Sequence, residues 1–197
     1  KDVRLSQPQQ MMASERKMID KAYGGDIIGV FDPGIFSIGD TICAPGKKFA
    51  FEGIPTFAPE HFARVRQIDT MKRKQFVKGI NQIAQEGAIQ VYHNEFNDVI
   101  LGAVGQLQFE VFEYRLKNEY NSEIRMEPLD YSVARWVAPG SPKDVKDYVV
   151  ARSTLVYDHF DRPILLFANQ YTLNNFMQKN PEVKLVEALD VDDTEYQ

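Results

Sequence analysis

The order of strand-like and helix-like segments in the middle of the chain constrains its fold more than any other sequence feature. Residues 62–68 alternate between two faces, as a strand requires, and apolar residues then recur at helical spacing as far as Gly87. The segments that follow are strands at 88–92 and 98–104, a helix at 106–120 and a strand at 122–126. This βαββαβ order predicts a ferredoxin-like, or split-βαβ, module.

The same order of elements returns in the remaining part of the chain, without sequence identity between the two halves. Ser141 and Pro142 predict a helix start, because serine caps a helix and proline suits its first position. The other expected elements are strands at 131–137, 155–157 and 163–167, a helix at 171–179 and a strand at 183–186. The repeat of pattern predicts a second, similar α/β module.

The N-terminal residues have a different character, with short strand-like runs separated by turns. Asp-Pro-Gly at 32–34 and Ala-Pro-Gly at 44–46 provide the proline and glycine that such turns favour. This spacing indicates part of a β-barrel or sandwich, since some fifty residues are few to close a barrel. The fold class expected for the whole chain is therefore α+β. The expected domains are 1–54, a barrel remnant; 55–189, a C-terminal domain with halves 60–127 and 128–189; and an acidic tail at 190–197.

Composition and cysteine count exclude several classes of protein. Hydrophobic residues make up 44% of the 197 residues and charged residues 26%, as in ordinary globular proteins. Cys43 is the only cysteine, so no internal disulfide can form, and the three histidines lie far apart in the sequence. We expect no metal site. No apolar run approaches the roughly 20 residues that cross a bilayer, and a reducing cytoplasm is the expected location.

The charge distribution gives the best candidate for a functional surface. The net charge is −5, but six acidic residues and one lysine follow Pro181, which leaves the rest of the chain balanced. Residues 64–78 hold six basic residues and one acid, Asp69. The basic residues are Arg64, Arg66, Lys72, Arg73, Lys74 and Lys78. A basic cluster of this kind attracts phosphate, although a solvated helix face would have the same composition.

No catalytic residues are expected. The chain has no Gly-x-x-x-x-Gly-Lys-Ser/Thr loop to hold a triphosphate. Asp26-Ile-Ile-Gly29 matches a short GTPase pattern without that loop upstream, and we interpret it as structural. Asp158 and Asp161 flank a predicted turn, and Cys43 has no evident basic partner, so each is also interpreted as structural.

Several longer stretches resemble the peptide chain release factor 3 family of translational GTPases. Gly25-Asp-Ile-Ile-Gly29 followed by Gly39-Asp-Thr41 is similar to the end of the barrel shared by many translational GTPases. The run Phe-Glu-Gly-Ile-Pro-Thr-Phe-Ala-Pro-Glu at 51–60 resembles the release factor family more specifically. Further similar stretches lie at 64–66, 74–79, 85–91, 99–109, 115–121 and 134–137.

The resemblance implies a longer protein with a GTPase domain, a β-barrel and a C-terminal domain. The family role it implies is guanine-nucleotide-dependent ribosome binding and dissociation of class I release factors during translation termination. This chain lacks the GTPase domain, so we expect no GTP hydrolysis and no cofactor within it. The implied partners are ribosomal RNA and ribosomal proteins, with class I release factors reached indirectly and no membrane. An incomplete barrel leaves sheet edges open, and residues 1–54 are expected to be rearranged, partly disordered or dimerising.

Two other interpretations stay open at this point. Ferredoxin-like repeats can bind small molecules between them, so a small-molecule-sensing regulatory module is the main alternative. The chain could also be the corresponding region of another translational GTPase, such as elongation factor G. The Gly-Ile-Pro-Thr-Phe-Ala-Pro run at 53–59 counts against that second alternative.

Overall fold

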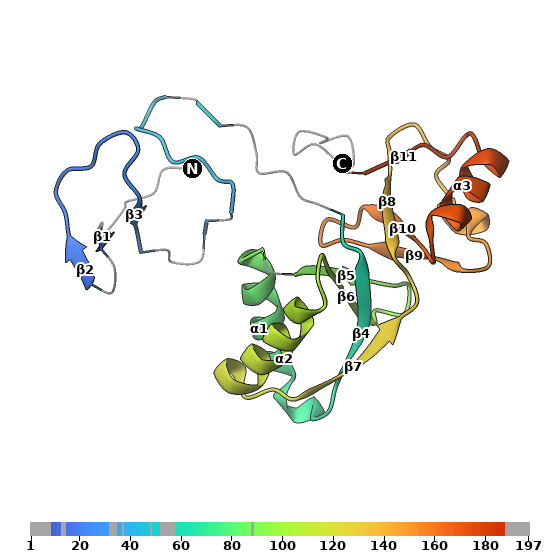
Figure 1. Ribbon diagram of the computed structural model, residues 1–197, viewed down its shortest axis with the longest axis horizontal. Coiled ribbons are helices and arrows are strands. Elements are labelled where there is room, and N and C mark those ends of the chain that lie inside the picture. Colours follow the sequence, from blue (N-terminus) through green and yellow to red (C-terminus); the bar gives the residue numbers. More distant parts are fainter. Residues whose placement is uncertain are drawn as a thin grey trace. The chain divides into compact units, whose positions relative to one another are not determined.

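Two separate β-sheets organise the chain in the computed structural model (Figure 1). One lies in a unit of residues 1–53 and the other in a unit of residues 54–197. The residues whose structure is described are 9–12, 15–31, 35–36, 38–47, 49–51, 58–87 and 89–187. The predicted turn at 32–34, most of the Gly-Ile-Pro-Thr-Phe-Ala-Pro run at 53–59 and the acidic tail at 190–197 lie outside the described residues.

The first unit contains a small antiparallel sheet in the order β2-β1-β3. Its strands are β1 Gln9–Met12, β2 Glu15–Met18 and β3 Ile28–Gly29. Of the short strand-like runs expected before the turn at 32–34, β3 therefore keeps only two residues. Tyr23, Ile27, Phe31 and Phe51 all have exposed side chains, so these large apolar residues contribute little buried surface to the unit.

The second unit contains an eight-stranded antiparallel sheet in the order β11-β8-β10-β9-β5-β6-β4-β7. Its elements are β4 His61–Gln67, η1 Thr70–Lys72, α1 Arg73–Gln85, β5 Gln90–His93, β6 Val99–Ala103, α2 Leu107–Tyr120, β7 Ile124–Leu129, β8 Val133–Val137, η2 Val145–Tyr148, β9 Ser153–Tyr157, β10 Pro163–Phe167, α3 Gln170–Lys179 and β11 Leu185–Val186. The α+β class expected from the sequence is confirmed.

The sheet consists of two four-stranded halves that meet at one point. The first half has the order β7-β4-β6-β5 and the second β11-β8-β10-β9, so each places its own first strand between its fourth and third. β5 and β9 pair through a single register position, His93 opposite Tyr157. The backbone hydrogen bonds between β5 and β9 would by themselves connect the two halves only weakly.

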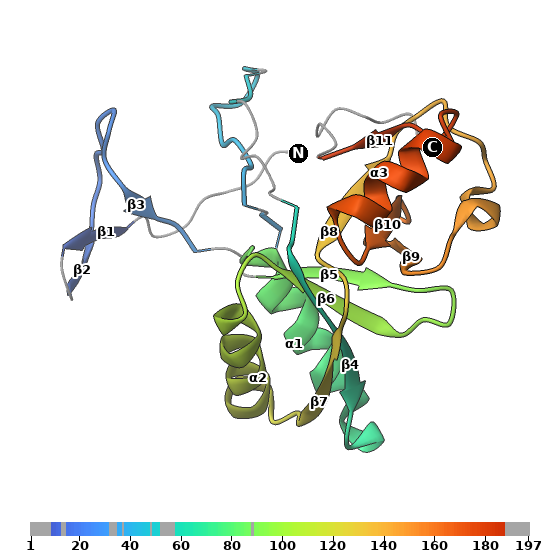
Figure 2. The ribbon, with the colours of Figure 1, turned by 45° about the vertical axis from the view of Figure 1, so that its right-hand side comes forward.

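Three layers of apolar side chains hold the second unit together. Helices α1 and α2 cover one face of the first half-sheet, and α3 lies against the second half-sheet (Figure 2). Between them lies a core to which both half-sheets contribute, with Phe62, Tyr92 and Ile100 from the first and Trp136 and Leu166 from the second. We call this the shared core. Its existence explains why the half-sheets stay together despite their single strand pair.

The turns after β5 and β9 have the same hydrogen-bond geometry. Asn94 Oδ1 accepts bonds from the backbone N–H groups of the residues two and four positions later, at 2.9 Å each. Asp158 Oδ1 does the same at 2.9 and 3.0 Å. Asn97 and Asp161 occupy the equivalent left-handed position with φ of 59° in both turns. Equivalent turns therefore end the equivalent strands of the two halves.

One predicted helix start is wrong. No α-helix begins at Ser141 or Pro142; the chain forms only the short 3-10 helix η2 from Val145. The reason is that Ser141 Oγ bonds to Lys184 instead of capping a helix, accepting from its backbone N–H at 2.9 Å and donating to its carbonyl at 3.3 Å. The serine thus fastens the loop to the segment that leads into β11.

Gly79 permits α1 and α2 to approach closely. A Cβ atom added at Gly79 would lie 2.5 Å from Leu116 Cδ1 and 2.8 Å from Tyr120 Cγ. We expect Gly79→Ala to lower the free energy of unfolding by about 1 kcal/mol or more, because overpacking outweighs the helix propensity of alanine. Urea denaturation measures this change. The control is Asn81→Ala on the exposed side of α1, and equal stability of the two variants would contradict the close approach.

Self-association of the first unit, expected from the sequence, stays a prediction. Ile27 and Phe31 lie beside the short strand β3 with exposed side chains. Replacing both with glutamate should shift the sedimentation coefficient of the concentrated chain toward the monomer value, because charge opposes apolar association. Sedimentation velocity at several concentrations measures this. A native chain that sediments as a monomer at every concentration would show the prediction to be wrong.

Candidate functional site

The structure divides the six predicted contact residues between two faces of the first half-sheet. Ala63 and Val65 of β4 pack in the core beneath α1 and α2. Side chains alternate along a strand, so Arg64 and Arg66 lie on the face opposite the helices. Lys72, Arg73, Lys74 and Lys78 belong to η1 and α1. The predicted cluster is therefore two separate groups.

The two arginines of β4 have acidic neighbours. Arg64 Nε lies 3.9 Å from Asp98 Oδ2, and Arg66 Nε lies 3.6 Å from Glu127 Oε2. The Arg66 position also faces Arg125 of β7 across the ladder, a basic residue that the sequence argument missed. Only the strand register brings Arg125 there. This face carries both signs of charge, which reduces its attraction for phosphate.

The cations of α1 have a different environment. Helix α1 contains no acidic residue, and Arg73, Lys74 and Lys78 are all exposed. Within the part of the chain that the structure describes, none of these three forms an ion pair or a side-chain hydrogen bond. Lys72 lies at their edge, and its Nζ donates to Asn121 Oδ1 at 3.1 Å. We call these four residues the α1 basic surface.

Local structure explains how the α1 basic surface is presented. Asp69 Oδ1 accepts a bond from Met71 N at 2.9 Å and so starts the 3-10 turn, but no side chain caps α1 itself. Phe76, Ile80 and Ile83 form the buried side of α1. Lys74 and Lys78 are four residues apart on the outer side, where like charges repel and the helix dipole disfavours cations in the first turn. An anion bound there would relieve both effects.

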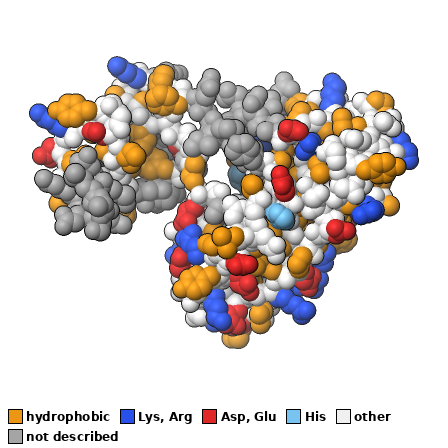
Figure 3. All heavy atoms as spheres, in the orientation of Figure 1, with side chains coloured by type: hydrophobic (Ala, Val, Ile, Leu, Met, Phe, Trp, Pro, Cys, Tyr) orange, Lys and Arg blue, Asp and Glu red, His pale blue; other side chains and the backbone are white. Residues whose placement is uncertain are grey.

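Positive charge is otherwise balanced on the visible surface. Figure 3 shows basic and acidic side chains interspersed over the face of the second unit that it displays. The described ion pairs include Lys117 with Glu123, Arg135 with Glu187 and Arg162 with Asp158. The α1 basic surface is distinguished by basic residues that follow one another closely in the chain, Lys72, Arg73, Lys74 and Lys78, none of which forms an ion pair with the described residues.

Arg115 of α2 connects the end of α1 to α2. Its guanidinium donates to Glu119, at 2.8 Å from Nε to Oε1, and to both carboxylate oxygens of Glu86, the residue that follows α1. These hydrogen bonds raise the pKa of Arg115, and the bond to Glu119 has the larger effect. The bond from Arg115 lowers the pKa of Glu119. Arg115 thus helps to fix α1 relative to α2.

The remaining sequence candidates have structural surroundings. Cys43 is exposed, and its Sγ donates to the carbonyl of Lys47 at 2.9 Å. Asp26 Oδ2 accepts a bond from Tyr23 N at 2.8 Å within a turn. Asp158 is buried, organises its turn and accepts a bond from Arg162 Nε at 2.7 Å. Each group therefore has a local role in a turn.

The described residues form neither a metal site nor a membrane-spanning helix. They contain no group of three or more His, Cys, Asp or Glu side chains arranged to hold a metal ion. Among the same residues, no helix combines the length and apolar character needed to cross a membrane.

Comparison with known proteins places the chain among translation factors. Residues 51–177 match the family described as class II release factor RF3, C-terminal domain, and residues 1–45 match elongation factor G domain 2. A peptide chain release factor 3 of Symbiobacterium thermophilum is 52% identical over 184 residues, covering 92% of this chain and 34% of the relative.

Two further proteins with the same name show similar agreement. The protein of Listeria welshimeri is 48% identical, with 96% of this chain and 36% of the relative covered. That of Rippkaea orientalis is 49% identical, with 94% and 35% covered. The chain thus spans about a third of the length of these relatives. None of the matches supports the small-molecule-sensing module that the sequence left open.

The link between Arg115 and Glu119 can be tested by titration. We expect Arg115→Gln to raise the pKa of the Glu119 carboxyl toward its ordinary value, because the strongest cause of its lowering is removed. The link contributes stability above the unfolded-state pKa of Glu119 and loses it as the pH falls through the folded-state pKa. Carboxyl NMR titration measures the shift. Arg125→Gln is the control, and an unchanged Glu119 pKa in Arg115→Gln would contradict the assignment.

Proposed function

We propose that this chain, which belongs to the peptide chain release factor 3 family, contacts the ribosome through its α1 basic surface. The family places the chain in protein synthesis, at translation termination. Ribosomal RNA is the proposed partner, because its backbone presents closely spaced phosphates, and the cations of this surface form no ion pair with any residue that the structure describes. In the cytoplasm, the longer protein would use this contact while it promotes the GTP-dependent dissociation of class I release factors.

The single observation that carries this proposal is the unpartnered state of Arg73, Lys74 and Lys78. A cation already paired with a carboxylate must lose that partner before it can bind phosphate. These three have no such competitor among the described residues, whereas Arg64 and Arg66 do. The α1 basic surface is therefore the better candidate of the two groups, and the β4 arginines take at most a secondary part.

We assign the binding and hydrolysis of GTP to the part of the longer protein outside this chain. The sequence has no glycine-rich phosphate loop, and its relatives are about three times as long. GTP would therefore be bound and hydrolysed elsewhere in the protein, with this chain supplying a surface that anchors it. Ribosomal proteins beside the contacted RNA would complete the interface.

Co-sedimentation with ribosomes at increasing salt concentration tests the proposal. Each phosphate neutralised contributes about 0.7–0.9 to the slope of log affinity against log salt concentration. We expect Lys74→Glu/Lys78→Glu to weaken binding at low salt and to make this slope shallower by between one and two units, as two phosphate contacts are lost.

The matched control is Lys143→Glu/Lys184→Glu, which makes the same change in net charge at exposed lysines outside α1. This control should bind nearly as the native chain does. Equal loss in both variants would mean that net charge alone governs binding. Salt-independent binding by the native chain would contradict the proposed phosphate contacts.

A further inference from the structure

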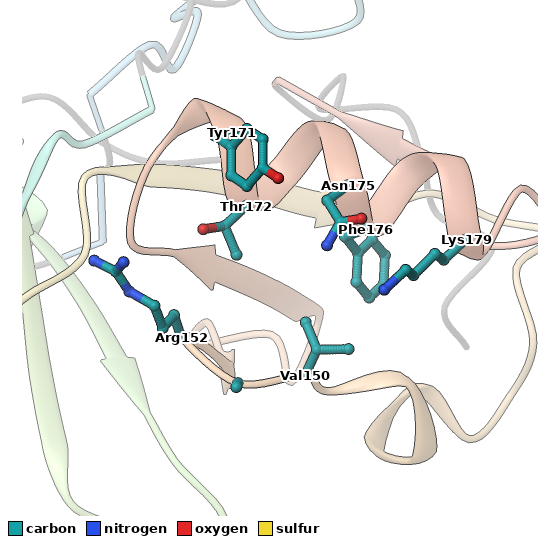
Figure 4. Close-up of a pocket in the computed structure, with 8 residues that line it drawn as sticks. Val150, Arg152, Tyr171, Thr172, Asn175, Phe176 and Lys179 are labelled. Carbon is teal, nitrogen blue, oxygen red and sulfur yellow. The ribbon is translucent and has the colours of Figure 1, made fainter.

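A hollow of about 300 Å³ lies between α3 and the loop that leads into β9. Figure 4 shows the side chains of Tyr171, Asn175 and Lys179 following one another along α3, with Arg152 projecting from the loop opposite. All of them line the hollow. It belongs to the second half-sheet and its helix, whereas the α1 basic surface belongs to the first.

The hollow has an apolar floor. Phe176 is almost completely buried and packs in the core beneath α3, where its ring lies 5.2 Å from that of Phe167. Val150 and Ala151 line the side formed by the loop. Phe176 is only 1% exposed, so the apolar surface open to a ligand comes mainly from Val150 and Ala151.

Arg152, at the edge of the hollow, has an unusual backbone conformation. Its φ of 65° lies in the left-handed region, which arginine rarely occupies. The Arg152 carbonyl accepts a bond from Ala168 N at 3.0 Å, which holds this backbone in place. The Arg152 side chain is 64% exposed, and its Nη2 lies 3.9 Å from Oδ2 of the exposed Asp130. An anion would have to displace Asp130 from Arg152, as it would displace the acidic partners of Arg64 and Arg66, so Lys179 is the hollow's cation without an ion pair among the described residues.

The residues of α3 add three kinds of contact on one helix face. Tyr171, Asn175 and Lys179 are spaced four residues apart, so they lie along one side of α3. The Tyr171 side chain is 80% exposed. Within the described ranges, the three side chains make no hydrogen bond or ion pair. The residues that line the hollow include no carboxylate to repel an anion.

This combination suits a nucleotide whose base is unpaired. An exposed aromatic ring can stack on a base, a free amide can bond to the edge of the base, and cations can bind the phosphates. We propose that the hollow binds an unpaired nucleotide of RNA. The proposal rests on the proposed function for the source of that RNA, the ribosome. An acidic peptide would use the two cations and the floor, but would leave the Tyr171 ring and the Asn175 amide without a role.

Fluorescence anisotropy with a short, labelled single-stranded RNA of mixed sequence tests the proposal on the whole 197-residue chain. We expect Tyr171→Ala to weaken binding by at least about fivefold, because a base-stacking partner is lost. Lys179→Ala should also weaken binding and reduce its salt dependence. Tyr171→Phe keeps the ring and should bind as the native chain does. Circular dichroism checks that each variant is folded.

The matched control is Tyr114→Ala, which removes another tyrosine with a highly exposed side chain, 69%, on α2. Equal affinities for Tyr171→Ala, Tyr114→Ala and the native chain would overturn the proposal. So would tighter binding of a labelled glutamate-rich peptide than of RNA, if that binding depended on Tyr171 and Lys179; the occupant would then be an acidic protein segment.

The RNA-binding assay and ribosome co-sedimentation together separate this inference from the proposed function. If Lys74→Glu/Lys78→Glu weakens RNA binding while Tyr171→Ala does not, the α1 basic surface stands and the hollow fails as a site. If Tyr171→Ala weakens RNA binding while the α1 variant does not alter ribosome co-sedimentation, the hollow stands and the proposed role of α1 fails.

Discussion

The shared core is the constraint on which the rest of the second unit depends. The two half-sheets exchange hydrogen bonds at a single register position, so their attachment rests on buried side chains from both. Burial of apolar surface supplies most of the favourable free energy in such a contact. Tyr92 illustrates how completely this core excludes water: burial, with a smaller contribution from the charge of Asp158, raises the pKa of its phenol. The hydroxyl remains neutral and donates to the Gln90 side chain.

The shared core also determines where the cations can act. Both faces of β4 are partly buried, with Phe62 in the shared core and Ala63 and Val65 beneath the helices. The basic residues of this strand, Arg64 and Arg66, therefore lie beside acidic side chains, those of Asp98 and Glu127. In the described parts of the chain, the cations on the outer side of α1 form no ion pair. The arginines of β4 and the cations of α1 are close together in sequence, but the α1 cations can bind a phosphate more readily.

Local periodicity predicted much of this arrangement, and non-local pairing accounts for most of what it missed. The alternation in residues 62–68 predicted the common face of Arg64 and Arg66, and helical spacing predicted the buried side of α1. It could not predict that Arg125 would face Arg66, which follows from the register of β4 with β7. Ser141 failed as a helix cap because its partner, Lys184, lies far along the chain. The hollow beside α3 was missed for the same reason, since its lining comes from separate segments.

The single strand pair between His93 and Tyr157 has a consequence for the order of folding. Each half-sheet draws its four strands from one continuous stretch of chain, so its contacts require only short loop closures. The shared core must bring Phe62 to residues as distant as Leu166. Chain entropy makes such distant contacts slow to form. We therefore expect the halves to gain structure separately and to dock late, with the step that joins them limiting the rate.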